Sequence, residues 1–133
     1  MSTYTWNAAP PSSRPRTSIQ AIGWQVRLHA YSWSPPTDVY ETEDSYIVRV
    51  EVAGMSRSDF SITVDKEHLV ISGVRSDTPE RRAYHQMEIR FGEFSTAVEV
   101  PPDADITRTE AEYADGFLTV ILPKIKAVRI KAS

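Results

Sequence analysis

The side chains that could do chemistry are few in this chain, and their spacing argues against catalysis. The three histidines, His29, His68 and His85, lie far apart and lack the short intervals of a metal site. Cysteine is absent, which excludes disulfides and thiolate ligands. Glu110 and Glu112 share one face of a predicted strand, where they are expected to be solvated, and no nucleophile accompanies them. We therefore expect no enzyme activity, no cofactor and no metal.

Nucleotide hydrolysis and membrane insertion are also not expected. The five glycines are scattered at predicted turns and strand ends rather than gathered in a phosphate-binding loop. No apolar run approaches the roughly 18–20 residues of a membrane span, and the first residues lack the order of a secretory signal. The expectation is a soluble, cytoplasmic protein.

Apolar and polar side chains alternate along most of the chain after residue 38, which predicts strands. Turn-forming residues separate these segments, and no helix long enough to cover a sheet is predicted. The expected fold is therefore all-β, a sandwich of seven to nine short strands. The predicted strands cover residues 39–42, 46–52, 60–64, 68–73, 94–100, 111–114 and 117–122.

The last two predicted strands carry the strongest local signal. Asp115-Gly116 lies between them and accepts the positive φ angles of a two-residue hairpin turn. Pro123 has no N–H to donate, so it ends the ladder. This segment predicts a β-hairpin at the end of the sandwich.

An unusually long connection follows the strand predicted at 68–73. Residues 74–92 far exceed the two to five residues that usually join antiparallel neighbours. Within them Met87, Ile89 and Phe91 alternate with polar residues, which predicts a further strand. A strand on a long polar loop cannot bury its apolar side alone, so we expect it to pair with a second subunit.

The first 37 residues differ in composition from the rest. They carry three arginines and no acid, whereas residues 38–133 hold 12 basic and 18 acidic side chains. All three tryptophans and five of the nine prolines lie in this arm, and residues 22–30 alternate as a strand would. This composition has two alternative interpretations: an organelle transit peptide, or a segment that contacts nucleic acid. Five prolines suit an amphipathic helix poorly, and the acidic domain would repel phosphate.

Five stretches together resemble the α-crystallin domain of bacterial and archaeal small heat-shock proteins, in the order that this family shows. The resemblance implies an immunoglobulin-like sandwich over residues 38–124, between a flexible N-terminal arm (1–37) and a short C-terminal tail (125–133). The stretches are PTDVYETEDSY at 36–46, VEVAGM at 50–55, LVISG at 69–73, YHQMEI at 84–89 before GEF at 92–94, and AEYADGFLTVILPK at 111–124.

The resemblance also implies how subunits assemble. A dimer forms when a segment of the long loop is exchanged onto a strand of the partner, and larger homo-oligomers form when a tail motif docks on a neighbour. The exchanged segment holds Tyr84, His85, Met87 and Ile89, and its receiving strand holds Asp38, Val39 and Tyr40. The tail motif is Val128-Arg129-Ile130, and its groove is formed by Phe60, Ile62 and Val64 beside the strand at 108–114.

The function implied by the resemblance is that of an ATP-independent chaperone, a holdase that binds partly unfolded proteins and prevents their aggregation under stress. Its partners would be client proteins and copies of itself, with no nucleic acid and no membrane span. Alternatively, the apolar arm residues pack inside the oligomer. The predicted client-binding residues are Trp6, Ile19, Ile22, Trp24, Val26, Leu28, Tyr31 and Trp33.

Three features depart from the family pattern. Thr96 stands where an arginine is frequent, Ala53 stands where proline is frequent, and only residues 125–127, spanning ~10 Å, precede the tail motif. Two other classes of protein are alternatives: a co-chaperone of the related CS-domain type that binds one specific partner, and a structural or adhesive immunoglobulin-like module. The exchanged segment and the tail motif argue against the first, and the family match argues against the second.

Overall fold

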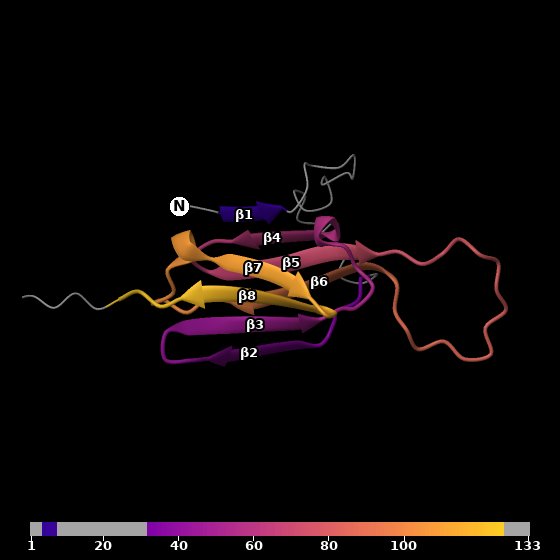
Figure 1. Cartoon of the computed structure of the whole chain (residues 1–133), viewed down its shortest axis with the longest axis horizontal. Coiled ribbons are helices and arrows are strands. Elements are labelled where there is room, and N and C mark those ends of the chain that lie inside the picture. Colours follow the sequence, from indigo (N-terminus) through magenta and orange to yellow (C-terminus); the bar gives the residue numbers. More distant parts are fainter. Residues whose placement is uncertain (1–3, 8–31, 127–133) are drawn as a thin grey trace, which may run out of the picture.

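The chain folds into a sandwich of two four-stranded antiparallel sheets (Figure 1). The computed structural model describes residues 4–7 and 32–126. One sheet has the strand order β1-β4-β5-β6, and the other has the order β2-β3-β8-β7. The predicted all-β sandwich is confirmed. The strands are β1 (Tyr4–Asn7), β2 (Thr37–Glu41), β3 (Ser45–Glu51), β4 (Phe60–Val64), β5 (His68–Arg75), β6 (Gly92–Glu99), β7 (Glu110–Ala114) and β8 (Phe117–Pro123).

The core lies between the sheets and is made by alternate residues of the strands. Val50 faces Leu118 across β3 and β8, and Ile62 faces Ile71 across β4 and β5. Among the described residues no polar or charged residue is buried, so apolar packing holds the two sheets together. The buried set is Val48, Val50, Val52, Phe60, Ile62, Val64, Leu69, Ile71, Phe94, Val100, Ala104, Ile106, Leu118, Val120 and Leu122.

Short turns fix the register of the hairpins. Asp115 and Gly116 have φ angles of 53° and 82°, so both central residues of the β7–β8 turn take the positive values that a two-residue hairpin of type I′ requires. Between β4 and β5, Asp65 Oδ1 accepts hydrogen bonds from the backbone N–H groups of His68 and Glu67, both at 2.8 Å. These donors, that of His68 first, lower the pKa of the Asp65 carboxyl.

Gly73 of β5 lies where the core leaves no space for a side chain. A Cβ atom at this position would lie 2.5 Å from the backbone oxygen of Asp59 and 2.7 Å from Cζ of Phe94. We expect Gly73→Ala to lower the free energy of unfolding by about 1–3 kcal/mol, because backbone and a buried ring would have to shift. Urea denaturation measures this loss, with the neighbouring Ser72→Ala as the control. Equal stability of the two variants would contradict the expectation.

Two elements differ from the sequence prediction. Residues 76–91 form no strand in the single chain, although alternation predicted one near Met87. The physical reason is that a strand needs a neighbour to pair with, and the loop has none within one subunit. Conversely, β1 pairs with β4 although its four residues are too short for periodicity to reveal. The strand predicted at 22–30 lies outside the described residues.

Candidate assembly surfaces

β2 is the edge strand of its sheet and carries exposed apolar side chains. It pairs with β3 on one side, and no described strand pairs with its other side. Val39 and Tyr40 are 52% and 44% exposed, and Asp38 between Thr37 and Val39 is exposed as well. Unpaired N–H and C=O groups beside apolar side chains form a template for another strand. The geometry of β2 therefore suits strand addition, and the exchange onto it that the family resemblance implies stays a prediction.

The loop of residues 76–91 leaves the end of β5, reaches well beyond the sheets and returns to β6 (Figure 1). Three of its large apolar side chains are largely exposed among the described residues: Tyr84, Met87 and Ile89 are 49%, 62% and 66% exposed. His85 is exposed too. Large apolar side chains in this arrangement favour burial against another molecule.

Arg82 braces the polar half of this loop. Its guanidinium forms ion pairs with Asp77 and Glu80, both at 3.1 Å, and its Nη1 donates to the hydroxyl of Tyr84 at 3.0 Å. These groups are partly or largely exposed to solvent, so the pairs contribute little to stability. The loop is thus shaped by weak contacts that a stronger partner can replace.

Arg75, at the end of β5, ties the base of the loop to the sandwich. Its guanidinium carbon lies 4.5 Å from the centroid of the Trp33 ring and 5.3 Å from that of Phe91. Its Nε donates to the backbone oxygen of Arg90 at 2.8 Å, and its Nη1 donates to that of Ala53 at 3.3 Å. Arg75 therefore joins the arm, the returning loop and the β3–β4 connection.

Trp33, one of the predicted client-binding residues, is half-buried and held against β6. Its N–H donates to the backbone oxygen of Glu93 at 3.1 Å, and its carbonyl accepts from the N–H of Ser95 at 3.0 Å. Its ring lies against Phe94, with 5.5 Å between centroids, and its Nε1 donates to the backbone oxygen of Gly92 at 3.3 Å. These contacts give Trp33 a structural role, and client binding there stays a prediction.

The other predicted client-binding residues are not placed by side-chain contacts. Trp6 belongs to β1, for which the structure gives the backbone pairing. The remaining ones, Ile19, Ile22, Trp24, Val26, Leu28 and Tyr31, lie outside the described residues. Their role also stays a prediction.

The edge of β4, predicted as one wall of the tail-docking groove, is occupied by β1. The two strands are antiparallel, with Tyr4 opposite Val64 and Trp6 opposite Ile62. Phe60, Ile62 and Val64 are only 1–3% exposed, so the three predicted groove residues lie in the closed core. The tail motif, Val128 and Ile130, lies outside the described residues.

On the other side of this predicted groove, Tyr113 of β7 fixes the spacing of the two sheets. Its ring centroid lies 4.9 Å from that of Phe60. Its hydroxyl donates to the backbone oxygen of Val52 at 2.8 Å and accepts from the N–H of Met55 at 3.3 Å. β4 and β7 are therefore in contact through Phe60 and Tyr113, beside the predicted groove, and tail docking there stays a prediction.

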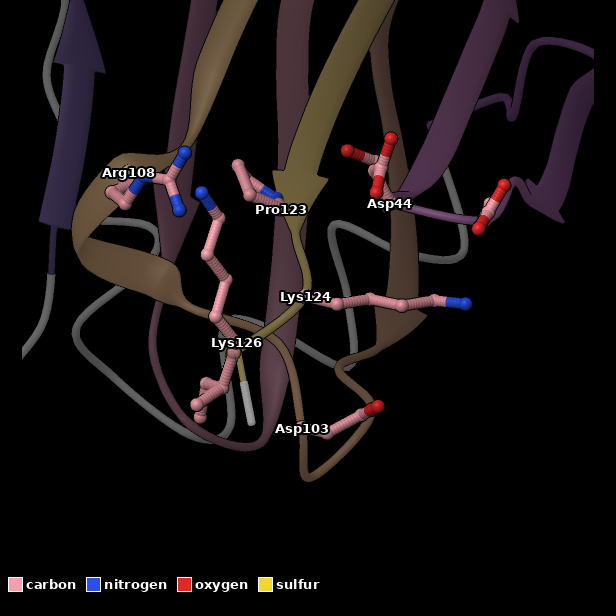
Figure 2. Close-up of a pocket in the computed structure, with 9 residues that line it drawn as sticks. Asp44, Asp103, Arg108, Pro123, Lys124 and Lys126 are labelled. Atoms are coloured by element: carbon pink, nitrogen blue, oxygen red, sulfur yellow. The ribbon is translucent and has the colours of Figure 1, made fainter. Parts of the chain in front are cut away.

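The tail leaves the sandwich beside a polar pocket of about 510 Å³ (Figure 2). The last backbone ties are the N–H of Lys124 to the oxygen of Asp44, at 2.8 Å, and the N–H of Ile125 to that of Asp103, at 2.7 Å. Figure 2 shows Lys126 extending toward Arg108. The pocket is lined by Glu43, Asp44, Ser45, Asp103, Arg108, Pro123, Lys124, Ile125 and Lys126.

Lys124 and Lys126 have different surroundings at this exit. The ammonium of Lys124 lies 2.7 Å from a carboxylate oxygen of Glu41 and donates to the backbone oxygen of Thr42 at 2.8 Å. Figure 2 shows Lys124 and Lys126 extending in different directions. Lys124 therefore anchors the end of β2, and the tie at Ile125 leaves two residues, spanning ~7 Å, before the tail motif.

Tyr46 gives this end of the sandwich a measurable dependence on pH. Its hydroxyl donates to Asp103 Oδ1 at 2.6 Å, and this hydrogen bond raises the pKa of Tyr46 from 10.0 to about 12. Because the folded state favours the protonated phenol, the stabilisation is complete below pH 10 and is lost as the pH rises toward 12. Tyr46→Phe should therefore lower the free energy of unfolding at neutral pH. Between pH 10 and about 12 this free energy should fall less for the variant than for the wild type. Urea denaturation at several pH values tests this, and a pH-independent difference would contradict it.

No metal-binding group of side chains is found in the part of the chain that the structure describes. Over residues 4–7 and 32–126, no group of three or more His, Cys, Asp or Glu side chains is placed to hold a metal ion. In the same residues, no helix has the length and apolar character needed to cross a bilayer. The notable features of the surface are thus strand edges and exposed apolar side chains.

Comparison with known proteins identifies the sandwich. Residues 38–133 match the model of the Hsp20/alpha crystallin family. The chain belongs to this family of small heat-shock proteins. Small heat shock protein C4 of Rickettsia felis is 32% identical over 120 residues, which cover 86% of this chain and 74% of that protein. Heat shock protein 16 of Schizosaccharomyces pombe is 35% identical over 102 residues, covering 74% of this chain and 71% of that protein.

A solved structure agrees with this assignment. A small heat-shock protein from Xylella fastidiosa, described as having a distinct high order structure, gives a TM-score of 0.67 at 25% identity. The match covers 77% of this chain and 98% of that one. The small heat-shock proteins are chaperones, and the resemblance inferred from the five sequence stretches is confirmed.

Proposed function

We propose that this small heat-shock protein is an ATP-independent holdase that assembles from dimers and prevents partly unfolded proteins from aggregating. One observation carries the proposal. Six of the seven large apolar side chains exposed in the described residues lie on segments predicted to assemble. They are Val39 and Tyr40 on β2, Tyr84, Met87 and Ile89 on the loop, and Ile125 at the tail.

The first contact in this proposal is the exchange of the loop onto β2. Met87 and Ile89 are 62% and 66% exposed, and burying an aliphatic side chain contributes ~1.5–3 kcal/mol. The unpaired edge of β2 supplies the backbone hydrogen-bonding groups that the loop lacks. Pairing the loop of one subunit with β2 of its partner would bury the exposed side chains of the loop and satisfy the unpaired backbone groups of β2. Thr96 means that the arginine frequent at this position in the family takes no part.

The second contact is the docking of Val128 and Ile130 on a neighbouring dimer. Burying two aliphatic side chains gives ~1.5–3 kcal/mol each, while ordering the tail costs ~1–2 kcal/mol per backbone position. A single docked tail is therefore weak and reversible. Many such contacts in one assembly hold through effective concentration. An assembly of this kind can release dimers and expose the arms.

In this proposal the arm is the part of the chain that binds client proteins. Residues 1–37 carry all three tryptophans, a net positive charge and no acid, whereas the domain is acidic. Transiently exposed apolar surface of an unfolding protein would bind the apolar side chains of the arm without a fixed sequence. The division into arm, domain and tail, and the cytoplasmic location, are parts of the proposal.

The test is the suppression of heat-induced aggregation of a test enzyme, followed by light scattering with and without ATP. We expect equal suppression in both conditions. Replacing Ile22, Trp24, Val26 and Leu28 together by serine should abolish suppression. The matched control replaces the alternating polar residues Gln25, Arg27 and His29 by serine and should retain it. Equal activity of the two variants would indicate that the client site lies outside the arm. No activity of the wild type would refute the function.

The tail contact is tested separately by the native mass of Val128→Gly with Ile130→Gly. We expect the assembly to fall to dimers or other small species, because the tail then has no apolar pair to bury. Light scattering across a concentration series measures this. The matched control Arg129→Gly changes the residue between them and should keep the native mass. An unchanged mass of the double variant would refute the role of the motif.

A further inference from the structure

The edge of β4 already holds an extended apolar segment of the same chain. β1 pairs antiparallel with β4 from Tyr4 opposite Val64 to Asn7 opposite Ser61. Its sequence, Tyr4-Thr5-Trp6, places large apolar residues two apart. The tail motif, Val128-Arg129-Ile130, has the same apolar-x-apolar spacing. Both ends of the chain therefore carry a segment with the pattern of a short strand.

A strand edge can pair with one strand at a time. It offers one row of N–H and C=O groups, and β1 uses those of β4 between Ser61 and Val64. Phe60, Ile62 and Val64 point into the core and are 1–3% exposed, so the feature of β4 that a docking segment can use is its backbone edge. A tail that docks along β4 must first displace β1.

We propose that β1 is a competing occupant of the edge of β4, so that the arm closes the groove in which the tail would dock. The inference rests on the tail docking proposed above. β1 has only four residues, so its pairing is weak enough to be exchanged. Release of β1 opens the edge to a neighbour's tail, and tail release returns the edge to the arm. Assembly and exposure of the first arm residues are thereby coupled.

The competition has a definite thermodynamic consequence. If β1 occupies the edge for about nine-tenths of the time, the apparent affinity for a tail falls tenfold, because only the open fraction can bind. Weakening β1 should therefore promote assembly, and fixing it should suppress assembly. These opposite effects distinguish a competing strand from one that merely supports the fold.

A reversible lock tests this directly. Thr5 and Thr63 face each other in the register, and directly opposed residues of an antiparallel pair have Cα atoms ~4.5–5.5 Å apart, within the range of a disulfide. The chain contains no cysteine, so Thr5→Cys with Thr63→Cys gives one defined bond. We expect the reduced variant to keep the wild-type native mass and the oxidised one to fall to small species. Each single-cysteine variant, treated with the same oxidant, is the control.

Binding of a labelled peptide of residues 125–133 gives the second measurement. The protein carries Val128→Gly and Ile130→Gly, so that its own tail does not compete. Oxidation of the cysteine pair should weaken peptide binding at least about tenfold, and Tyr4→Ser with Trp6→Ser should tighten it by about the same factor. The matched control for the second variant is Thr5→Ser, which should leave the affinity unchanged.

The outcomes distinguish the competition at β4 from tail docking itself and from the position of β1. Equal peptide affinity in the oxidised and reduced forms overturns the competition and leaves tail docking intact. No peptide binding to any variant refutes tail docking itself, and the competition with it. A disulfide that does not form, or that joins two chains, overturns the assignment of β1 to the β4 edge of its own chain.

Discussion

Met87→Asp with Ile89→Asp is expected to leave the sandwich folded and to dissociate the protein into monomers. Both side chains are more than half exposed in the single chain, so the substitutions remove nothing from the core. In the proposed exchange they are buried against the partner's β2, and two unpaired carboxylates in that contact would cost several kcal/mol. The effect on the native mass should be complete at micromolar concentration.

Light scattering gives the mass, and circular dichroism verifies that the sheets remain. The matched control is Gln86→Asp with Arg90→Gln, which changes the net charge by the same amount at the alternate positions of the loop. We expect this control to retain the native mass. If the double aspartate variant also retains it, the loop is not the dimer contact and the proposed exchange fails.

Phe94→Ala is expected to lower the free energy of unfolding more than Gly73→Ala does. The Phe94 ring is 1% exposed and stands between Trp33 and Phe60, with centroid distances of 5.5 Å and 6.1 Å. Removing a buried phenylalanine costs ~3–5 kcal/mol. The opposing Gly73 has no side chain that could move into the cavity, which places the loss in the upper part of this range.

Urea denaturation at a fixed protomer concentration measures this loss, because assembly makes the stability depend on concentration. Thr96→Ala, two residues along β6, is the control. It removes one hydrogen bond, from Thr37 Oγ1 to Thr96 Oγ1 at 3.3 Å, and should cost about 1 kcal/mol. A loss from Phe94→Ala no larger than that of the control would mean that the contacts of Phe94 with Trp33 and Phe60 do not stabilise the sandwich.

Local sequence predicted the strands that have one face in the core and the other face in solvent. The register of β7 and β8 follows from Asp115 and Gly116, since few residues accept positive φ angles at both positions of a tight turn. The alternation of β3 and β4 similarly shows which of their residues are buried. These features depend on contacts between neighbours in sequence or on a period of two, and both can be read from the chain itself.

The loop of residues 76–91 marks the limit of what local sequence can predict. Its alternating residues have the pattern of a strand, yet Met87 and Ile89 are exposed and unpaired in one subunit. A strand is completed by hydrogen bonds to a neighbour, and the sequence does not state whether that neighbour lies in the same chain. The exchange contact, the tail motif and the client-binding residues stay predictions.

By itself, the sequence determined the all-β sandwich, because periodicity and turn chemistry are local properties, and the resemblance of five stretches indicated the family. Only the tertiary structure decided that Trp33 is held on β6 by Arg75 and Phe94, and that β1 occupies the edge of β4. Both are contacts between residues far apart in the chain. A four-residue strand and a single tryptophan carry no period, so their positions follow from which edges the completed sheets leave unpaired.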